Sequence, residues 1–318
     1  MNRAPAGVWV LVGIGLVAFG SSPVLIRLAG DAPALALAAW RTSVVALALA
    51  PFALGPGRGE ILALSRRDWL LVAAAGVLLG LHFIGWIVSV QLTSVASAAV
   101  LVTTSPVFLA VLGGVLLGET TSRRAWGAIL VAMGGAAMIG LSEPPAGSYP
   151  NPAVGNALAL GAAVLISAYF LIGRAVRPRL GFVTYFWSLN VMAALTCLLA
   201  CLWAGVPLGL PLPAAALAVA MGLGPGLAGH GSFVAALRYL PAAWIGLLGL
   251  AEPILASVAA WAGFGEVPQP LALAGMALVL GSIAVVVSGD RSAPAPNLGA
   301  SPTEGDPESG GAHEQSSR

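Results

Sequence analysis

The sequence predicts an all-α membrane protein with ten transmembrane helices, arranged as two five-helix repeats of inverted topology. Three observations predict this fold: the composition, the spacing of the apolar runs and a match of the chain with itself. Of the 318 residues, 58% are hydrophobic and only 8% are charged, and the mean hydropathy is +0.95. Soluble domains carry roughly 25% charged residues. A chain this apolar lacks the polar surface that a water-soluble core requires.

Ten apolar runs are long enough to cross a bilayer, which takes about 20 residues per helix. The third and fourth runs are joined only by Gln91, Leu92 and Thr93, so their boundary is the least distinct. In chain order the expected spans are 8–26, 34–54, 69–90, 94–117, 125–141, 153–173, 182–204, 214–237, 241–264 and 271–289.

The arginines give the expected spans an orientation. If the N-terminus is cytoplasmic and the spans alternate, the connections and ends on the cytoplasmic side hold twelve of the fourteen basic residues, all of them arginine. Only Arg27 falls outside, and Arg41 lies within a span. Basic residues are enriched in the cytoplasmic loops of membrane proteins. We therefore expect a multi-pass protein of the cytoplasmic membrane with both termini in the cytoplasm.

An internal repeat divides the chain into halves. At an offset of 147 residues, Trp40 matches Trp187, Pro106 matches Pro253 and Glu119 matches Glu266. Five spans is an odd number, so the second half must enter the membrane from the opposite side, as in many secondary transporters. The predicted domains are one repeat at 1–145, a second at 153–290, and a tail at 291–318.

The tail is rich in proline, glycine, serine and acidic residues. Such a segment buries little apolar surface, and we expect it to be disordered in the cytoplasm.

Residues 222–231, GLGPGLAGHG, contain a formal G-x-G-x-x-G match. A dinucleotide-binding loop requires a preceding strand and a following acidic residue, and an apolar span provides neither. Pro225 and the glycines weaken the helix instead. Two interpretations stay open: close helix packing through glycine, and a flexible helix that lines a cavity.

The chain resembles the EamA-type transporters of the drug/metabolite transporter superfamily over about residues 8–289. The resemblance is carried by the Ser-Ser-Pro-Val run at 21–24 and by the pattern of proline followed by Gly-Glu in the fourth and ninth spans, Pro106 with Gly118-Glu119 and Pro253 with Gly265-Glu266. It implies a central cavity lined by spans one, three, four, six, eight and nine. It also implies transport of small organic metabolites, often export of amino acids or related compounds.

Glu252 is the only acidic residue well inside a span, and a charge at that depth is a functional candidate because its insertion is costly. It precedes Pro253, and its repeat partner is Ser105, beside Pro106. Each proline leaves a carbonyl one turn earlier without its helical donor, at Val102 and Gly249. The candidate role of Glu252 is to exchange a proton or to bind a substrate ammonium. The alternative is a protonated structural glutamate.

Other polar and aromatic groups at membrane depth are weaker candidates for contact with solute or protons: His82, His230, Trp86, Thr104 beside Ser105, and Arg41. Arg41 is a candidate for binding a substrate carboxylate, or for pairing with Asp31. Thr103 and the aromatic residues Tyr169, Trp244 and Trp261 are further possible lining residues. Glu119 and Glu266 end their spans, and with Pro106, Pro253 and Pro225 they are expected to act at helix breaks and gates.

A secondary transporter of a small organic solute is the expected function, with export favoured by the resemblance and uptake as the alternative. An intramembrane enzyme or a non-transporting sensor is the alternative from another class. The spans contain no paired acids, no Ser-based catalytic motif and no metal-binding motif, so we expect no enzyme activity, no metal and no cofactor. Expected partners are the solute and the lipid bilayer, with no nucleic acid. A homodimer is possible through the glycines of the fifth and tenth spans, Gly134-Gly135 and Gly275 with Gly281.

Overall fold

The computed structural model describes residues 5–93, 95–142, 150–264 and 267–289, and within these ranges the chain forms helices and no strands. The elements are α1 (Ala6–Gly20), α2 (Ser22–Leu28), α3 (Ala34–Leu54), α4 (Arg58–Leu62), α5 (Arg66–Leu92), α6 (Val95–Val102), α7 (Ser105–Leu117), α8 (Arg123–Leu141), α9 (Pro152–Val176), α10 (Phe182–Ala204), α11 (Leu212–Met221), the π-helix η1 (Gly222–His230), α12 (Gly231–Ala236), α13 (Ala242–Gly249), α14 (Glu252–Phe264) and α15 (Pro270–Gly289).

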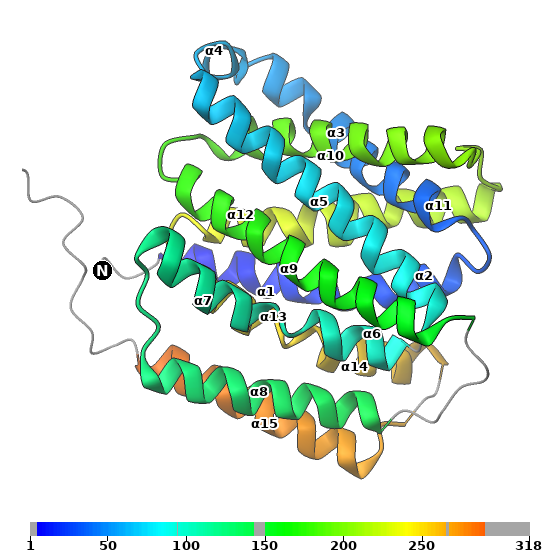
Figure 1. Cartoon of the computed structure of the whole chain (residues 1–318), viewed down its shortest axis with the longest axis vertical. Helices are drawn as coiled ribbons and strands as arrows, with labels where there is room; N and C mark the ends of the chain where they lie inside the picture. The colour runs from blue at the N-terminus through cyan, green and yellow to red at the C-terminus, as the bar shows by residue number, and fades with distance from the viewer. Residues whose placement is uncertain (1–4, 94, 143–149, 265–266, 290–318) are drawn as a thin grey trace, which may run out of the picture.

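The two halves of the chain pack against each other along most of their length. From the first half, α5 lies against both α9 and α10, and α3 lies against α10. The helices α8 and α15 form a pair along one edge of the molecule (Figure 1). A large hydrophobic core joins the other long helices, and a smaller one lies around α8 and α15. The interior is therefore built mainly from contacts between the halves.

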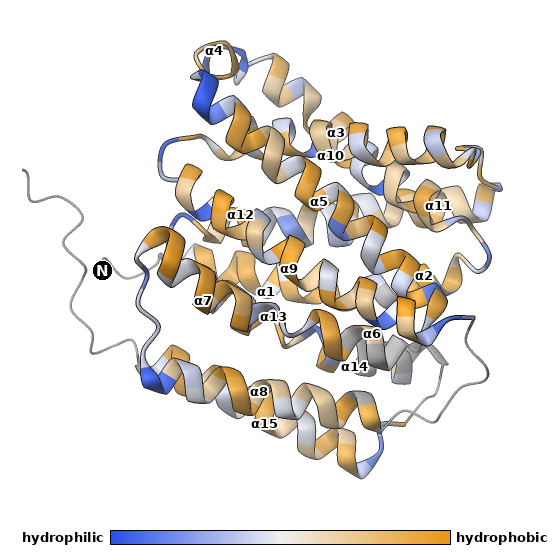
Figure 2. Cartoon of the chain, in the orientation of Figure 1, coloured by the Kyte–Doolittle hydropathy of each residue, from blue (hydrophilic) through white to orange (hydrophobic). Residues whose placement is uncertain are grey.

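The helices are mostly hydrophobic along their length, and most hydrophilic residues lie at their ends and in the connections (Figure 2). Leu47 is 72% exposed and Trp203 is 92% exposed. Large apolar side chains on the outside are unfavourable in water and favourable in lipid, so this surface belongs in a bilayer. The expected all-α membrane class is confirmed.

Within the described residues, eight helical segments are long and apolar enough to cross a membrane. The ninth expected span is not among them, because its apolar helical run, Ala242–Leu255, is shorter than 18 residues among the described residues. The fifth expected span, α8, is not among them either. The predicted count of ten and the inverted orientation of the halves stay predictions. Glu266 and the predicted tail at 291–318 lie outside the described residues.

Short polar residues and glycines set the helix ends where the sequence has them. Ser65 precedes α5, and its hydroxyl accepts a hydrogen bond from the backbone N–H of Asp68 at 3.1 Å. Asn151 accepts one from Val154 at 3.2 Å and begins α9 in the same way. These side chains satisfy N–H groups that a helix start leaves unpaired. Gly118 ends α7 at φ 66°, a left-handed conformation that favours glycine.

Glycine brings α8 and α15 into backbone contact. A Cβ atom at Gly135 would lie 2.6 Å from the carbonyl oxygen of Gly275, and a Cβ atom at Gly275 would meet the carbonyl oxygen of Gly135. Gly135 and Gly275, two of the glycines expected at a dimer interface, thus pack against each other within one chain. Gly134 and Gly281 have no atoms near their Cβ positions within the described residues.

Replacing Gly135 with valine is expected to lower the free energy of unfolding by about 1–3 kcal/mol, the usual cost of overpacking. The matched control is Gly134→Val, which adds the same side chain on the open face of α8. The measurement is the thermal unfolding of both variants in detergent. Equal unfolding temperatures for the two would contradict this packing.

The segment GLGPGLAGHG forms the π-helix η1 within one long apolar helical run, Leu212–Ala236. Close helix packing and cavity lining, the two uses expected of this segment, each describe part of it. A Cβ atom at Gly222 would lie 2.7 Å from the Val44 side chain, and one at Gly226 would lie 2.9 Å from Val45, so these glycines pack closely on α3. His230, at the end of η1, lines the central cavity. Pro225 is buried inside η1.

Candidate functional site

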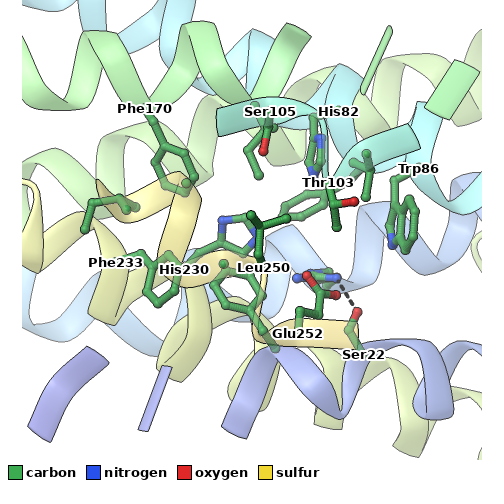
Figure 3. Close-up of a pocket in the computed structure, with 18 residues that line it drawn as sticks. Ser22, His82, Trp86, Thr103, Ser105, Phe170, His230, Phe233, Leu250 and Glu252 are labelled. Carbon is green, nitrogen blue, oxygen red and sulfur yellow. Dashed lines mark hydrogen bonds between the residues drawn. The ribbon is translucent and has the colours of Figure 1, made fainter. Parts of the chain in front are cut away.

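A cavity of about 70 Å³ lies at the centre of the molecule and is lined by both halves of the chain. Its walls come from α1, α2, α3, α5, α6 and α7 of the first half, and from α9, η1, α12, α13 and α14 of the second. Figure 3 shows the labelled side chains converging on it from these helices. Six of the seven residues predicted to contact solute or protons line this cavity: Glu252, His82, His230, Trp86, Ser105 and Arg41.

Two broken helices bring backbone to the cavity. The helix α6 ends at Val102 and α7 begins at Ser105, whereas α13 ends at Gly249 and α14 begins at Glu252. The breaks therefore lie just before Pro106 and Pro253, at equivalent positions of the repeat. Val102 and Gly249, whose carbonyls were expected to lose their helical donors, both line the cavity. Irregular backbone at membrane depth is tolerated where it is buried in protein or lines a cavity.

Hydroxyl groups complete the hydrogen bonding around the first break. The Thr103 and Thr104 hydroxyls donate to the carbonyls of Val100 and Leu101, at 2.8 and 2.7 Å. The Ser167 hydroxyl, on α9, lies 3.1 Å from the carbonyl oxygen of Ser105. Thr103 lines the cavity, and Thr104 does not. Successive residues of a helix point about 100° apart, which separates the two side chains; a solute contact by Thr104 stays a prediction.

Arg41 and Glu252 place opposite charges in the cavity wall. Arg41 is 2% exposed, and its Nη1 donates to the Ser22 hydroxyl at 3.3 Å, the dashed line in Figure 3. Its guanidinium lies 4.1 Å from the centre of the Phe83 ring, a cation–π contact. Glu252, the first residue of α14, lines the same cavity. Asp31, the alternative partner for Arg41, is exposed.

Two polar atoms in the wall have no hydrogen-bond partner within the described residues: Nε of Arg41 and Nδ1 of His230. Both residues are at least 97% buried. Burying an unpaired polar group is costly, so such atoms at a cavity are candidates for binding a ligand.

The two histidines lie together among aromatic rings, with their ring centres 6.3 Å apart. Nδ1 of His82 is 2.9 Å from the carbonyl oxygen of Ala162. A carbonyl oxygen only accepts hydrogen bonds, so this nitrogen carries a proton. The His230 ring contacts Phe19 and Phe83 edge-on, with ring centres 4.6 and 5.0 Å away.

Sequence reasoning missed four phenylalanines that line the cavity: Phe19, Phe83, Phe170 and Phe233. The available signal was their helical spacing from the polar residues, since Phe83 follows His82 and Phe233 lies three residues after His230. Of the other aromatic candidates, Tyr169 is fully buried outside the lining and Trp261 is 55% exposed. Trp244 packs against the two hydrophobic cores instead.

Glu119 lies outside the cavity, in an ion pair at the ends of four helices. Its Oε1 accepts from Nε of Arg174 at 2.6 Å, and its Oε2 accepts from the backbone N–H of Ala242 at 3.4 Å. Arg174 also donates to the carbonyl of Leu237 at 2.8 Å. The pair thus links the ends of α7 and α9 to the turn between α12 and α13.

Pro106 is buried against Gly246 of α13.

Comparison with protein families gives two matches to the EamA-like transporter family, over residues 7–141 and 153–288. The chain belongs to this family. The two matches establish a multi-pass membrane protein of a transporter family, and transporters of this kind are generally not enzymes.

A solved crystal structure of a protein has the same fold. It superposes with a TM-score of 0.75, covering 91% of this chain and 99% of that chain, at 19% sequence identity. At this identity the likeness is evidence for the fold alone. Among curated proteins, none matches the sequence.

Proposed function

We propose that this protein is a secondary transporter that moves a small amino-acid-like solute across the cytoplasmic membrane by alternating access, in the direction of export. The observation that carries the proposal is a cavity between the two family-matched halves that holds Glu252 and Arg41 in aromatic walls. An ammonium group would bind Glu252, and a carboxylate would bind Arg41 through its unpartnered Nε. The phenylalanines and Trp86 would contact an apolar side chain.

The proposed architecture is ten spans in two inverted repeats. The breaks before Pro106 and Pro253 support it, because discontinuous helices at equivalent positions are typical of inverted-repeat transporters. Exchange of conformation between the halves would then open the cavity to each side in turn.

The size of the cavity supports a closed state. About 70 Å³ holds a few water molecules, whereas pockets for larger organic ligands are roughly 300–1,000 Å³. Entry of an amino-acid-like solute would therefore require the helices to separate.

The experiment is a comparison of the growth medium of bacteria that express the wild-type protein or an empty vector, by untargeted mass spectrometry. A solute that accumulates outside only with the protein supports export and identifies the substrate. Depletion of a solute from the medium would support uptake, the alternative direction. No change in either direction, at verified membrane levels, would contradict a metabolite transporter.

In this proposal the Glu119–Arg174 pair closes the cytoplasmic end of the cavity. Glu119→Gln is expected to raise access from that side about tenfold, because a charge-assisted hydrogen bond contributes about 1.5–3 kcal/mol. The measurement is the rate at which an impermeant thiol reagent modifies Ser105→Cys in inside-out vesicles, with Cys197 and Cys201 replaced by alanine.

The matched control for this prediction is Asp68→Asn. It removes the exposed Arg179–Asp68 pair, whose atoms are 3.0 Å apart and which lies away from the cavity. Exposed pairs contribute little, so the rate should stay near that of the wild type. A Glu119→Gln rate equal to this control would contradict the gating role.

A further inference from the structure

A second hollow, outside the central cavity, lies where the start of α1 meets the loop after α9 and the end of α12. It is an open groove of about 610 Å³, and its polar residues are Arg177, Arg238 and Tyr239. Its apolar wall includes Val10 and Leu11 of α1. A pair of basic residues beside an apolar wall is the arrangement expected of a lipid-binding groove.

Neither arginine forms an ion pair with a described residue, although Glu60 acts on Arg177 electrostatically from a longer distance. The ion pairs between described residues are Arg174–Glu119 and Arg179–Asp68, and neither includes Arg177 or Arg238. Arg177 is fixed by donating from Nε to the carbonyl of Val234 at 3.3 Å and from Nη1 to the carbonyl of Leu180. Burial, and then the neighbouring charge of Arg238, lowers the pKa of Arg177. Two like charges are thus held together, and an anion between them would relieve their repulsion.

The apolar wall of the groove faces lipid. Val10 is 63% exposed and Leu11 is 42% exposed, on a helix whose surroundings in the cell are acyl chains. Tyr239 is 43% exposed at the rim. Tyrosine is enriched at the membrane–water interface, where its ring is in the apolar region and its hydroxyl reaches the headgroups. The groove therefore lies at the depth of the lipid headgroups in the membrane.

We propose that this groove binds an anionic phospholipid, with its phosphate between Arg177 and Arg238 and an acyl chain along Val10 and Leu11 of α1. Guanidinium groups bind phosphate oxygens in pairs of parallel hydrogen bonds. Basic pockets between transmembrane helices on the cytoplasmic side bind acidic headgroups in other membrane proteins. The site is separate from the transport cavity, and the proposal does not depend on which solute the protein moves.

The test uses the full-length protein in detergent micelles, titrated with dioleoyl phosphatidylglycerol or dioleoyl phosphatidylcholine. Native mass spectrometry counts the lipids bound. The wild type should bind one phosphatidylglycerol more tightly than any phosphatidylcholine. Arg238→Gln should weaken that binding roughly fivefold, the effect of one arginine near an anionic surface. Arg238 is exposed and makes no side-chain contact to the transport cavity, so this variant should fold.

The matched control is Arg124→Gln, an equally exposed arginine at the start of α8 outside the groove. An equal loss in both variants would show general charge attraction and overturn the proposal. Complete displacement of the lipid by millimolar glycerol 3-phosphate would assign the groove to free phosphates instead. A variant that ends at residue 290 and binds the lipid more than tenfold tighter would identify the acidic C-terminal segment as the occupant. Equal binding of the two lipids by the wild type would also refute the site.

Discussion

Replacing Glu252 with glutamine is expected to reduce transport roughly 10- to 100-fold, the effect of losing a hydrogen bond to a charged group of about 1.5–3 kcal/mol. Glutamine has nearly the same shape as glutamate, but it can neither bind an ammonium group as an anion nor carry a proton across. The measurement is the initial rate of solute export by cells with equal membrane levels of each variant.

Glu252→Asp is the control for this prediction, because it keeps the charge and shortens the side chain by one methylene. It should keep more activity than Glu252→Gln, with a weaker apparent affinity. If the two variants export equally, the charge of Glu252 has no role in transport, and the structural interpretation of this residue is correct.

The free energy of unfolding is expected to depend on whether Arg41 and Glu252 are both present. Removing one partner of a buried ion pair typically costs about 3–5 kcal/mol. No direct ion pair joins Arg41 and Glu252 among the described residues, so Glu252→Gln should cost only part of this, because the buried guanidinium keeps its proton. Arg41→Gln should cost less, because the carboxyl that it leaves can become neutral by taking up a proton. The measurement is the unfolding temperature of each variant in the same detergent.

The double variant Arg41→Gln with Glu252→Gln completes this cycle. It should recover stability relative to Glu252→Gln alone, since no unpaired charge is left in the wall, while transport stays lost. If the effects of the two substitutions simply add, the residues do not interact across the cavity, and a shared role for them is excluded.

Much of the polar part of the candidate site could be predicted from the sequence, because a charged or imidazole side chain at membrane depth is rare. Glu252, Arg41, His82 and His230 were chosen on this ground, and all four line one cavity. The proline repeat likewise placed the two helix breaks. These signals are strong because placing a polar or charged side chain in lipid costs free energy wherever it occurs.

The rest of the site could not be predicted, for physical reasons that differ between residues. A phenylalanine that lines a cavity has the same local sequence as one that packs between helices, so Phe170 gave no signal. The pairing of Glu119 with Arg174 joins residues 55 positions apart, and it depends on how α7 and α9 pack. Pro225 predicted a weakened helix, but not that wide π-turns would keep the run continuous.

The measurement that tests the central claim most directly is solute counterflow in proteoliposomes, with the solute identified from the growth medium. It compares the wild type with Gly249→Leu and Gly281→Leu. Gly249 lines the cavity and has room for a Cβ atom, whose closest contact would be Phe233 at 3.8 Å, while Gly281 is open on the outer face of α15. A leucine at 249 would fill the cavity, so counterflow should fall roughly tenfold or more, which corresponds to at least about 1.4 kcal/mol. Gly281→Leu should retain wild-type counterflow. Wild-type counterflow in Gly249→Leu would show that the solute takes another route.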